Sequence, residues 1–101
     1  EDIVLEYIID IVQATRKPRE YGLSLHRYIT NGASVRATMA LERAARAYAF
    51  LQGRSFVSPD DVKQMALPVL RHRVLLTYEA EAEGISSDTI LEMILQKVPV
   101  P

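Results

Sequence analysis

The run Ser58-Pro59-Asp60-Asp61 constrains the fold more than any other segment, because it fixes where a helix begins. A serine hydroxyl can cap a first turn, proline suits the first helical position, and acidic side chains are stabilised by the positive end of the helix dipole. Pro68 lacks a backbone donor and disfavours helical geometry at the residue before it. We therefore expect this helix to stop or kink near Ala66, followed by a short turn at 70–73 and an extended segment at 74–76.

A second helix is predicted over about residues 35–52, with Ser34 as its N-cap and Gly53 just beyond its last turn. Apolar spacing assigns seven residues to its inward face. These residues are Val35, Met39, Ala40, Ala44, Ala47, Tyr48 and Leu51.

End signals and apolar spacing also predict the remaining elements. A first helix carries one apolar stripe from Ile3 to Val12 and closes before Pro18. Residues 18–33 show no sustained period and are expected to form a loop or a short irregular helix. A brief helix over 78–83 and a better one over 87–97, with Ser86 as N-cap, complete an all-α fold with room for very short extended segments.

Composition places the chain among globular proteins and excludes several kinds of site. The 101 residues are 49% hydrophobic and 25% charged, and they include no cysteine, which rules out disulfides and cysteine-based metal or nucleophilic sites. No apolar run approaches the roughly 20 residues that span a bilayer, and no signal pattern is present, so a soluble, cytoplasmic protein is expected. Because the chain starts at Glu1 without methionine, we expect a piece of a longer polypeptide.

The segment Gly32-Ala33-Ser34-Val35-Arg36 places a cation at the start of the second helix, where the dipole favours an anion. The guanidinium, the Ser34 hydroxyl and the free N–H groups of the first turn could hold a phosphate oxygen, and Gly32 leaves room for its approach. The alternative is an ordinary surface arginine that leans on a carboxylate or reaches into water. The residues alone leave both interpretations open.

Other polar clusters favour structure over chemistry. Arg71-His72-Arg73 is a candidate contact with a neighbouring subunit, but cations at the end of a helical turn also satisfy its last carbonyls. His26 and His72 lack an acidic partner pattern, so no metal site is predicted. The glutamates of segment 79–83 scatter around a helix, as a solvated acidic face does.

Five ordered blocks resemble the C-terminal lid of MoxR-type AAA+ ATPases over nearly the whole chain. They are Gly32-Ala33-Ser34-Val35-Arg36-Ala37, Gly53-Arg54 with Val57-Ser58-Pro59-Asp60-Asp61-Val62, Val69-Leu70-Arg71-His72-Arg73, Tyr78-Glu79-Ala80-Glu81-Ala82-Glu83-Gly84, and Val98-Pro99-Val100-Pro101. The resemblance implies a small helical bundle that forms one lid domain over residues 1–101. That domain would be excised from a longer ATPase and would hinge against a larger nucleotide-binding domain.

The resemblance also implies a role for the first block. It is similar to the sensor 2 motif, whose arginine contacts the terminal phosphates of ATP and couples nucleotide state to lid position. Arg36 would be that arginine, counted as catalytic, and Gly32 and Ser34 would join it in binding the cofactor. The family usually has proline where this chain has Val35, which costs local rigidity rather than chemistry. Whether Arg36 acts on the nucleotide of its own subunit or of a neighbour stays open.

The chain lacks the Gly-x-x-x-x-Gly-Lys-[Ser/Thr] phosphate loop, so by itself it should not hydrolyse ATP. In the full-length protein, ATP and Mg²⁺ would be held mainly by the large AAA+ domain of the same chain. The other implied partners are neighbouring ATPase subunits in a ring and a client protein that is remodelled as by a chaperone, with no DNA or membrane partner. Two other hypotheses remain: a purely architectural lid, and a helical module that binds protein or nucleic acid. The near-zero net charge weakens the nucleic-acid hypothesis.

Overall fold

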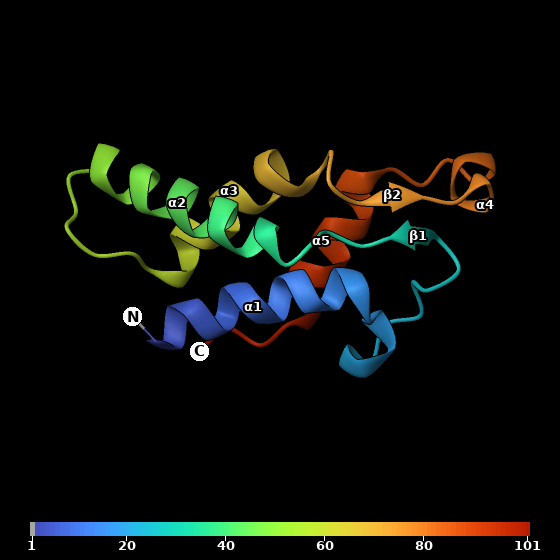
Figure 1. The fold of residues 1–101 in the computed structure, drawn as a ribbon, viewed down its shortest axis with the longest axis horizontal. Coiled ribbons are helices and arrows are strands. Elements are labelled where there is room, and N and C mark those ends of the chain that lie inside the picture. The colour runs from blue at the N-terminus through green and yellow to red at the C-terminus, as the bar shows by residue number, and fades with distance from the viewer. Residues whose placement is uncertain (1) are drawn as a thin grey trace.

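Five α-helices and a two-stranded sheet make up the fold that the computed structural model describes over residues 2–101 (Figure 1). In chain order the elements are α1 (Asp2–Arg16), the 3-10 helix η1 (Pro18–Tyr21), β1 (Ile29–Asn31), α2 (Arg36–Leu51), α3 (Pro59–Leu70), β2 (Leu75–Leu76), α4 (Tyr78–Ala82) and α5 (Ser87–Lys97). The all-α prediction, with very short extended segments, is confirmed. The molecule is elongated, 43 × 23 × 21 Å, and the start of α1 and the C-terminus lie at the same end of it (Figure 1).

Several predicted helix ends that rest on local signals are confirmed. The Ser58 side chain accepts from the Asp61 N–H and the Asp61 side chain accepts from the Ser58 N–H, which makes a complete capping box at the start of α3. The Ser86 side chain likewise accepts from the Thr89 N–H at the start of α5. Gly53 and Gly84 take positive φ values of 81° and 73° just beyond α2 and α4, where a side chain would be strained.

The expected stop of α3 near Ala66 is wrong, because the helix continues through Pro68 to Leu70; the alternative, a kink there, stays a prediction. Pro68 lies on the exposed face of α3, so the carbonyl of Gln64 that loses its intrahelical donor can bind water instead. The predicted turn is confirmed at residues 71–73, although Leu70 still belongs to α3, and the extended segment is limited to Leu75–Leu76, with Val74 in a bend before it.

The predicted inward face of α2 is also wrong. Val35 and Met39 are 67% and 55% exposed, whereas the buried stripe is the i, i+4 series Ala37, Leu41, Ala45 and Ala49. Because this stripe is mostly alanine, α3 can pack closely against it, and α2 and α3 make the most extensive helix contact in the fold. Larger apolar residues are thereby left on the outer faces of α2.

Residues 18–33 hold more order than the predicted loop or irregular helix. They form η1 and then β1, which pairs antiparallel with β2, Ile29 opposite Leu76 and Asn31 opposite Leu75. The sheet joins two segments more than 40 residues apart and places β1, β2 and α4 together at one end of the molecule (Figure 1).

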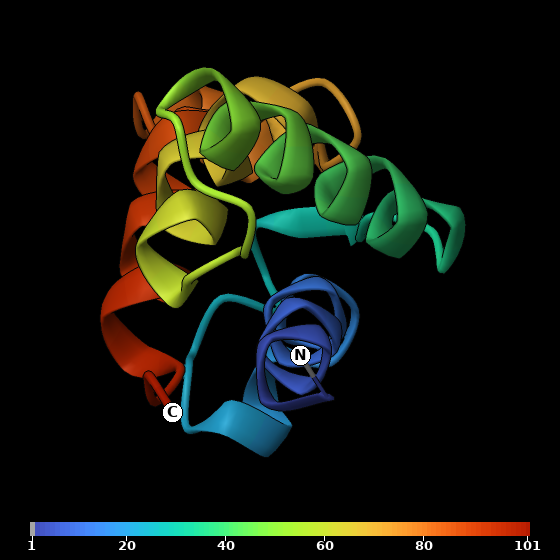
Figure 2. The same ribbon diagram turned by 90° about the vertical axis from the view of Figure 1, so that its left-hand side faces the viewer.

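The core lies between α1, the pair α2 and α3, and α5. Figure 2 shows α1 on one side, α2 and α3 on the other, and α5 along the edge between them. The fully buried side chains of this core include Ile8, Ile11, Leu41, Leu70 and Leu91. The segment between β1 and α2 crosses from the sheet to the start of α2 and runs beside the C-terminal end of α1.

Candidate functional site

The start of α2 differs from the prediction at its cap. The helix begins at Arg36, Val35 occupies the N-cap position in helical conformation, and no side chain caps the turn. The N–H groups of Ala37 and Thr38 donate to the carbonyls of Ser34 and Val35 at 2.8 and 3.0 Å. Ser34 is therefore not the predicted hydroxyl cap, because a tight turn satisfies these donors through the backbone.

Arg36 is exposed at this helix start and stands without a carboxylate partner. Among residues 3–101, no hydrogen bond or ion pair involves its side chain, and the first turn of α2 holds no acidic residue. Its charge lies at the positive end of the α2 dipole, which is an unfavourable place for a cation. An anion brought to this position would interact favourably with both the guanidinium and the helix end.

The backbone that leads to Arg36 is fastened to α1. A Cβ on Gly32 would lie 2.3 Å from the backbone oxygen of Thr15, a contact that no side chain can make. The N–H of the buried Ala33 donates to the Thr15 hydroxyl oxygen at 2.9 Å, and Arg16 donates to the Ala33 carbonyl at 3.4 Å. Gly32 therefore has a packing role at α1 that the sequence did not indicate.

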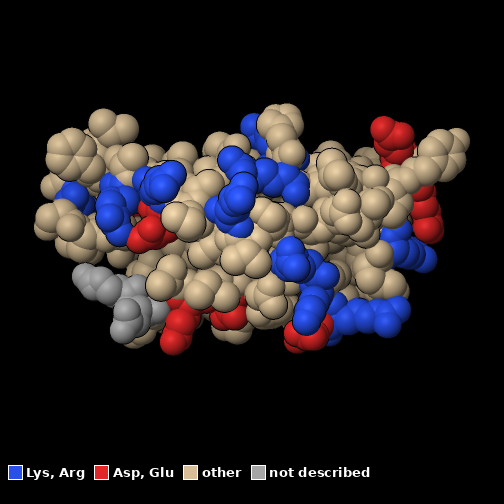
Figure 3. Space-filling view, viewed as in Figure 1, with Lys and Arg blue, Asp and Glu red and all other residues tan. Residues whose placement is uncertain are grey.

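An apolar hollow of about 510 Å³ lies between α1 and α2, and Arg36 is one of the residues that line it. Ile9 and Val12 of α1 face Val35 and Met39 across it. On the face seen in Figure 3, Lys and Arg side chains gather over α2 and over the C-terminal end of α1, and uncharged surface separates the two groups.

The Arg71-His72-Arg73 group divides between partners rather than forming one site. Arg71 donates through Nε and Nη2 to the two carboxylate oxygens of Asp88 at 2.9 and 3.1 Å, which ties the turn after α3 to the start of α5. Arg73 donates to the Val69 carbonyl at 3.0 Å, so it satisfies a carbonyl in the last turn of α3. His72 is exposed. Within the described chain, no hydrogen bond or ion pair links this group to Arg36.

Sequence reasoning missed the most buried ion pair. Asp61 is fully buried, and Arg54 donates to its two carboxylate oxygens at 2.5 and 2.6 Å. This hydrogen bonding from Arg54, followed by the bonds from Ser58, lowers the pKa of Asp61 to about 2. The pair closes the turn between α2 and α3. The signal was available in the spacing: an arginine directly after the α2 stop and an acid at the third position of α3.

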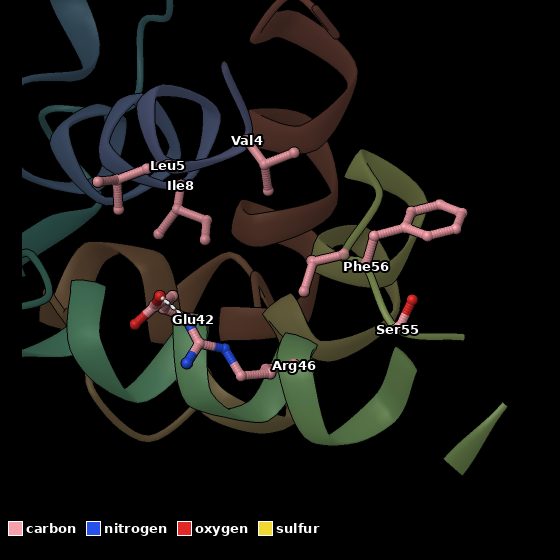
Figure 4. Close-up of a pocket in the computed structure, with 8 residues that line it drawn as sticks. Val4, Leu5, Ile8, Glu42, Arg46, Ser55 and Phe56 are labelled. Carbon is pink, nitrogen blue, oxygen red and sulfur yellow. Dashed lines mark hydrogen bonds and ion pairs between the residues drawn. The ribbon is translucent and has the colours of Figure 1, made fainter. Parts of the chain in front are cut away.

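A second hollow, of about 480 Å³, lies between the N-terminal half of α1, α2 and the segment before α3 (Figure 4). Val4, Leu5 and Ile8 line its α1 side, and the Glu42–Arg46 ion pair lines its α2 side. No three His, Cys, Asp or Glu side chains of the described chain converge as metal ligands. Within the same residues, no helix combines the length and the apolar character needed to cross a membrane.

Comparison with known proteins gives consistent matches. Residues 23–94 match the AAA lid domain family. The chain is 39% identical over 99 residues to chaperone MoxR1 of Mycobacterium tuberculosis, covering 97% of this chain and 26% of that protein. It is 41% identical over 101 residues to the uncharacterised protein YeaC of Bacillus subtilis, covering 100% of this chain and 29% of that protein. It is 37% identical over 102 residues to protein MoxR of Paracoccus denitrificans, covering 94% and 30%.

A solved structure matches the whole fold. The crystal structure of a candidate ATPase from Cytophaga hutchinsonii superimposes with a TM-score of 0.96 at 49% identity, covering 100% of this chain and 31% of that one. The chain thus spans less than a third of the length of each of these relatives.

Proposed function

This chain belongs to the AAA lid domain family, with MoxR chaperones among its relatives, and from that premise we propose that it closes over ATP and senses the terminal phosphate through Arg36. In this proposal residues 1–101 are one lid domain of a longer ATPase. The nucleotide state of that ATPase would set the position of the lid, and lid motion would drive chaperone-like remodelling of a client protein.

The observation that carries the proposal is the lone charge of Arg36. A cation at the positive end of a helix, not paired with any carboxylate of residues 3–101, costs the isolated domain roughly 0.3–1 kcal/mol. A phosphate oxygen at the guanidinium turns that cost into an attraction, and a fixed cation near developing negative charge favours phosphoryl transfer. Ser34 and Gly32 stay candidate contacts beside it, although the first-turn donors of Ala37 and Thr38 are already satisfied.

The residues present fit part of an ATP site. Arg36 supplies one phosphate contact, and the described chain offers no acidic cluster for Mg²⁺, so the ion and most phosphate contacts belong to the large AAA+ domain. When bound, ATP supplies the transferable phosphoryl group. The apolar hollow beside Arg36, lined by Ile9, Val35 and Met39, is a suitable contact surface for that domain.

Subunit assembly is the second part of the proposal. We place the large domain of the same chain on the Arg36 side, and neighbouring ATPase subunits of a ring against the exposed edge that carries Arg71, His72 and Arg73. Because Arg71 and Arg73 also hold the turn after α3 in place, His72 is the residue of this group whose side chain is free to face a neighbour. A cytoplasmic setting without DNA or membrane partners completes the proposal.

The test is ATP turnover by the longer ATPase with Arg36→Ala, with sedimentation to confirm equal assembly. We expect a loss of about a hundredfold, the scale of removing one charge-stabilising group. Arg43→Ala is the matched control, since it removes an exposed arginine two turns further along α2. Unchanged turnover in Arg36→Ala at equal assembly would leave the lid an architectural element. Binding of random DNA at low salt would instead favour a nucleic-acid module.

A further inference from the structure

We infer that Thr15 of α1 is a positioning residue for Arg36, and that the C-terminal end of α1 is thereby coupled to the nucleotide. The inference rests on the proposed function of Arg36 and adds a control point to it. The coupling element is a latch formed by Thr15, Gly32 and Ala33.

The Thr15 hydroxyl is buried and uses both of its hydrogen-bonding roles. Thr15 is 1% exposed. Its hydroxyl donates to the Val12 carbonyl at 2.6 Å, within α1, and accepts the Ala33 N–H at 2.9 Å, from the segment before α2. A threonine that only closed its own helix turn would need the first bond alone. The second bond links two segments 18 residues apart.

Gly32 brings the two backbones into contact at the same place. The position of a Cβ on Gly32 falls within 2.3–2.7 Å of Thr15 and Arg16 backbone atoms, so only glycine allows the approach that the Ala33 hydrogen bond needs. Ala33 is itself fully buried, so its N–H has no water to replace the Thr15 hydroxyl. Hydrogen bond and close contact together fix this segment against α1.

The latch determines where α2 starts and therefore where Arg36 lies. Arg36 follows Ala33 by three residues, and the turn between them is closed by backbone bonds from Ala37 and Thr38. Ala37 is fully buried and anchors the other side of the turn. Since no side chain of the described residues holds the guanidinium itself, its position depends on this backbone. A shift at the end of α1 therefore moves Arg36.

The first measurement is amide hydrogen exchange at Ala33 in this chain. Thr15→Val keeps the shape and removes the acceptor, and we expect exchange at Ala33 to become about tenfold faster, the equivalent of one lost hydrogen bond. Thr15→Ser restores the hydroxyl and should restore slow exchange. Thr30→Val is the matched control, because Thr30 is exposed on β1.

The second measurement is ATP turnover by the longer ATPase in a double-mutant cycle. Thr15→Val should lower kcat about tenfold, short of the roughly hundredfold that a 1 Å misplacement can cost, and Thr15→Ser should recover it. In the Arg36→Ala background, Thr15→Val should have no further effect on kcat, because the residue acts through Arg36.

Four outcomes of these measurements would overturn the inference or the function on which it rests. Where Arg36→Ala does lower turnover, faster exchange at Ala33 with unchanged kcat in Thr15→Val would overturn the inference, as would an equal loss of kcat with and without Arg36. If Arg36→Ala leaves turnover unchanged, the proposed function fails, and the positioning role is then judged by exchange alone. Unchanged exchange at Ala33 in Thr15→Val would overturn that role.

Discussion

Replacing Asp61 by asparagine removes the buried half of the ion pair with Arg54. The wild-type carboxylate has its pKa lowered from 3.8 to about 2, mainly by hydrogen bonding from Arg54. At about 1.4 kcal/mol per pKa unit, this contributes about 2 kcal/mol to the free energy of unfolding. Because the folded pKa is the lower one, that stability is present above about pH 4 and is lost as the pH falls towards 2.

At neutral pH, Asp61→Asn should lower the free energy of unfolding by about 2–4 kcal/mol. Arg54 keeps its charge but loses its only ion-pair partner among residues 3–101, and its side chain is 32% exposed, so water relieves part of the cost. For a domain of this size, such a loss is a large share of a total of about 5–10 kcal/mol.

The assay is urea unfolding followed by circular dichroism at pH 7 and at pH 2.5. The difference between wild type and Asp61→Asn should shrink by about 1.5 kcal/mol at the lower pH, because the carboxyl group is then protonated in the unfolded chain but only partly protonated in the folded one. Asp88→Asn is the control: it removes a carboxylate that also takes two bonds from an arginine, but Asp88 is 43% exposed, so the cost should stay below about 1 kcal/mol. Equal losses for the two variants, or a difference at Asp61 that does not change with pH, would refute the reasoning.

Three further predictions concern stability of the chain alone. Gly32→Ala should lower the free energy of unfolding by about 1–3 kcal/mol because its Cβ collides with the Thr15 backbone, whereas Gly84→Ala, with open space around it, should cost only about 1 kcal/mol; chemical denaturation compares the two. Leu91→Ala should cost about 2–5 kcal/mol through the cavity it leaves in the core, measured the same way. Arg36→Ala should leave the melting temperature unchanged or slightly raised, since it removes an unpaired cation from a helix start; a clear drop on calorimetry would indicate a structural partner.

The sequence predicts elements well where the responsible groups are neighbours in the chain. The capping box of Ser58 and Asp61, the Ser86 cap and the positive-φ stops at Gly53 and Gly84 each act within one turn. Such interactions do not depend on how the chain folds elsewhere.

Predictions that depend on distant partners were less reliable. The pairing of β1 with β2 needs residues 29–31 and 75–76 to meet, and nothing local in either segment indicates the other. The buried face of α2 is set by how closely α3 approaches it. Because α2 has alanines on every side, the spacing of its apolar residues does not indicate which face is buried. Pro68 was tolerated because it lies on the exposed side of α3, a fact of the tertiary structure.

For the candidate site too, the sequence predicts what depends on local signals better than what depends on distant partners. The sequence points to Arg36 because a cation at a helix start is a local anomaly. The same reasoning wrongly assigned the N-cap to Ser34, and it read Gly32 as leaving room for a phosphate without predicting that Gly32 packs against α1. The latch to Thr15 depends on α1 lying against the segment before α2, which only the folded chain provides. The one signal that could have pointed to this contact is a threonine inside the helix, because threonine is less favourable there when its hydroxyl bonds only to its own turn.

Arginines that stabilise this fold have partners inside it. Arg54 and Arg71 each bond two oxygens of an aspartate, and Arg73 bonds a carbonyl at the end of α3. Arg36 has none of these among the described residues, yet the backbone on both sides of it is held by hydrogen bonds, from Ala33 to Thr15 and from Ala37 and Thr38 within the first turn of α2. A fixed backbone that carries an unpaired guanidinium leaves the charge available for an anion and limits the conformational entropy lost when the anion binds. In the function proposed above, a lid that paired this arginine internally would have to break that pair to respond to a nucleotide, so an anionic partner from outside the described chain would account for both features.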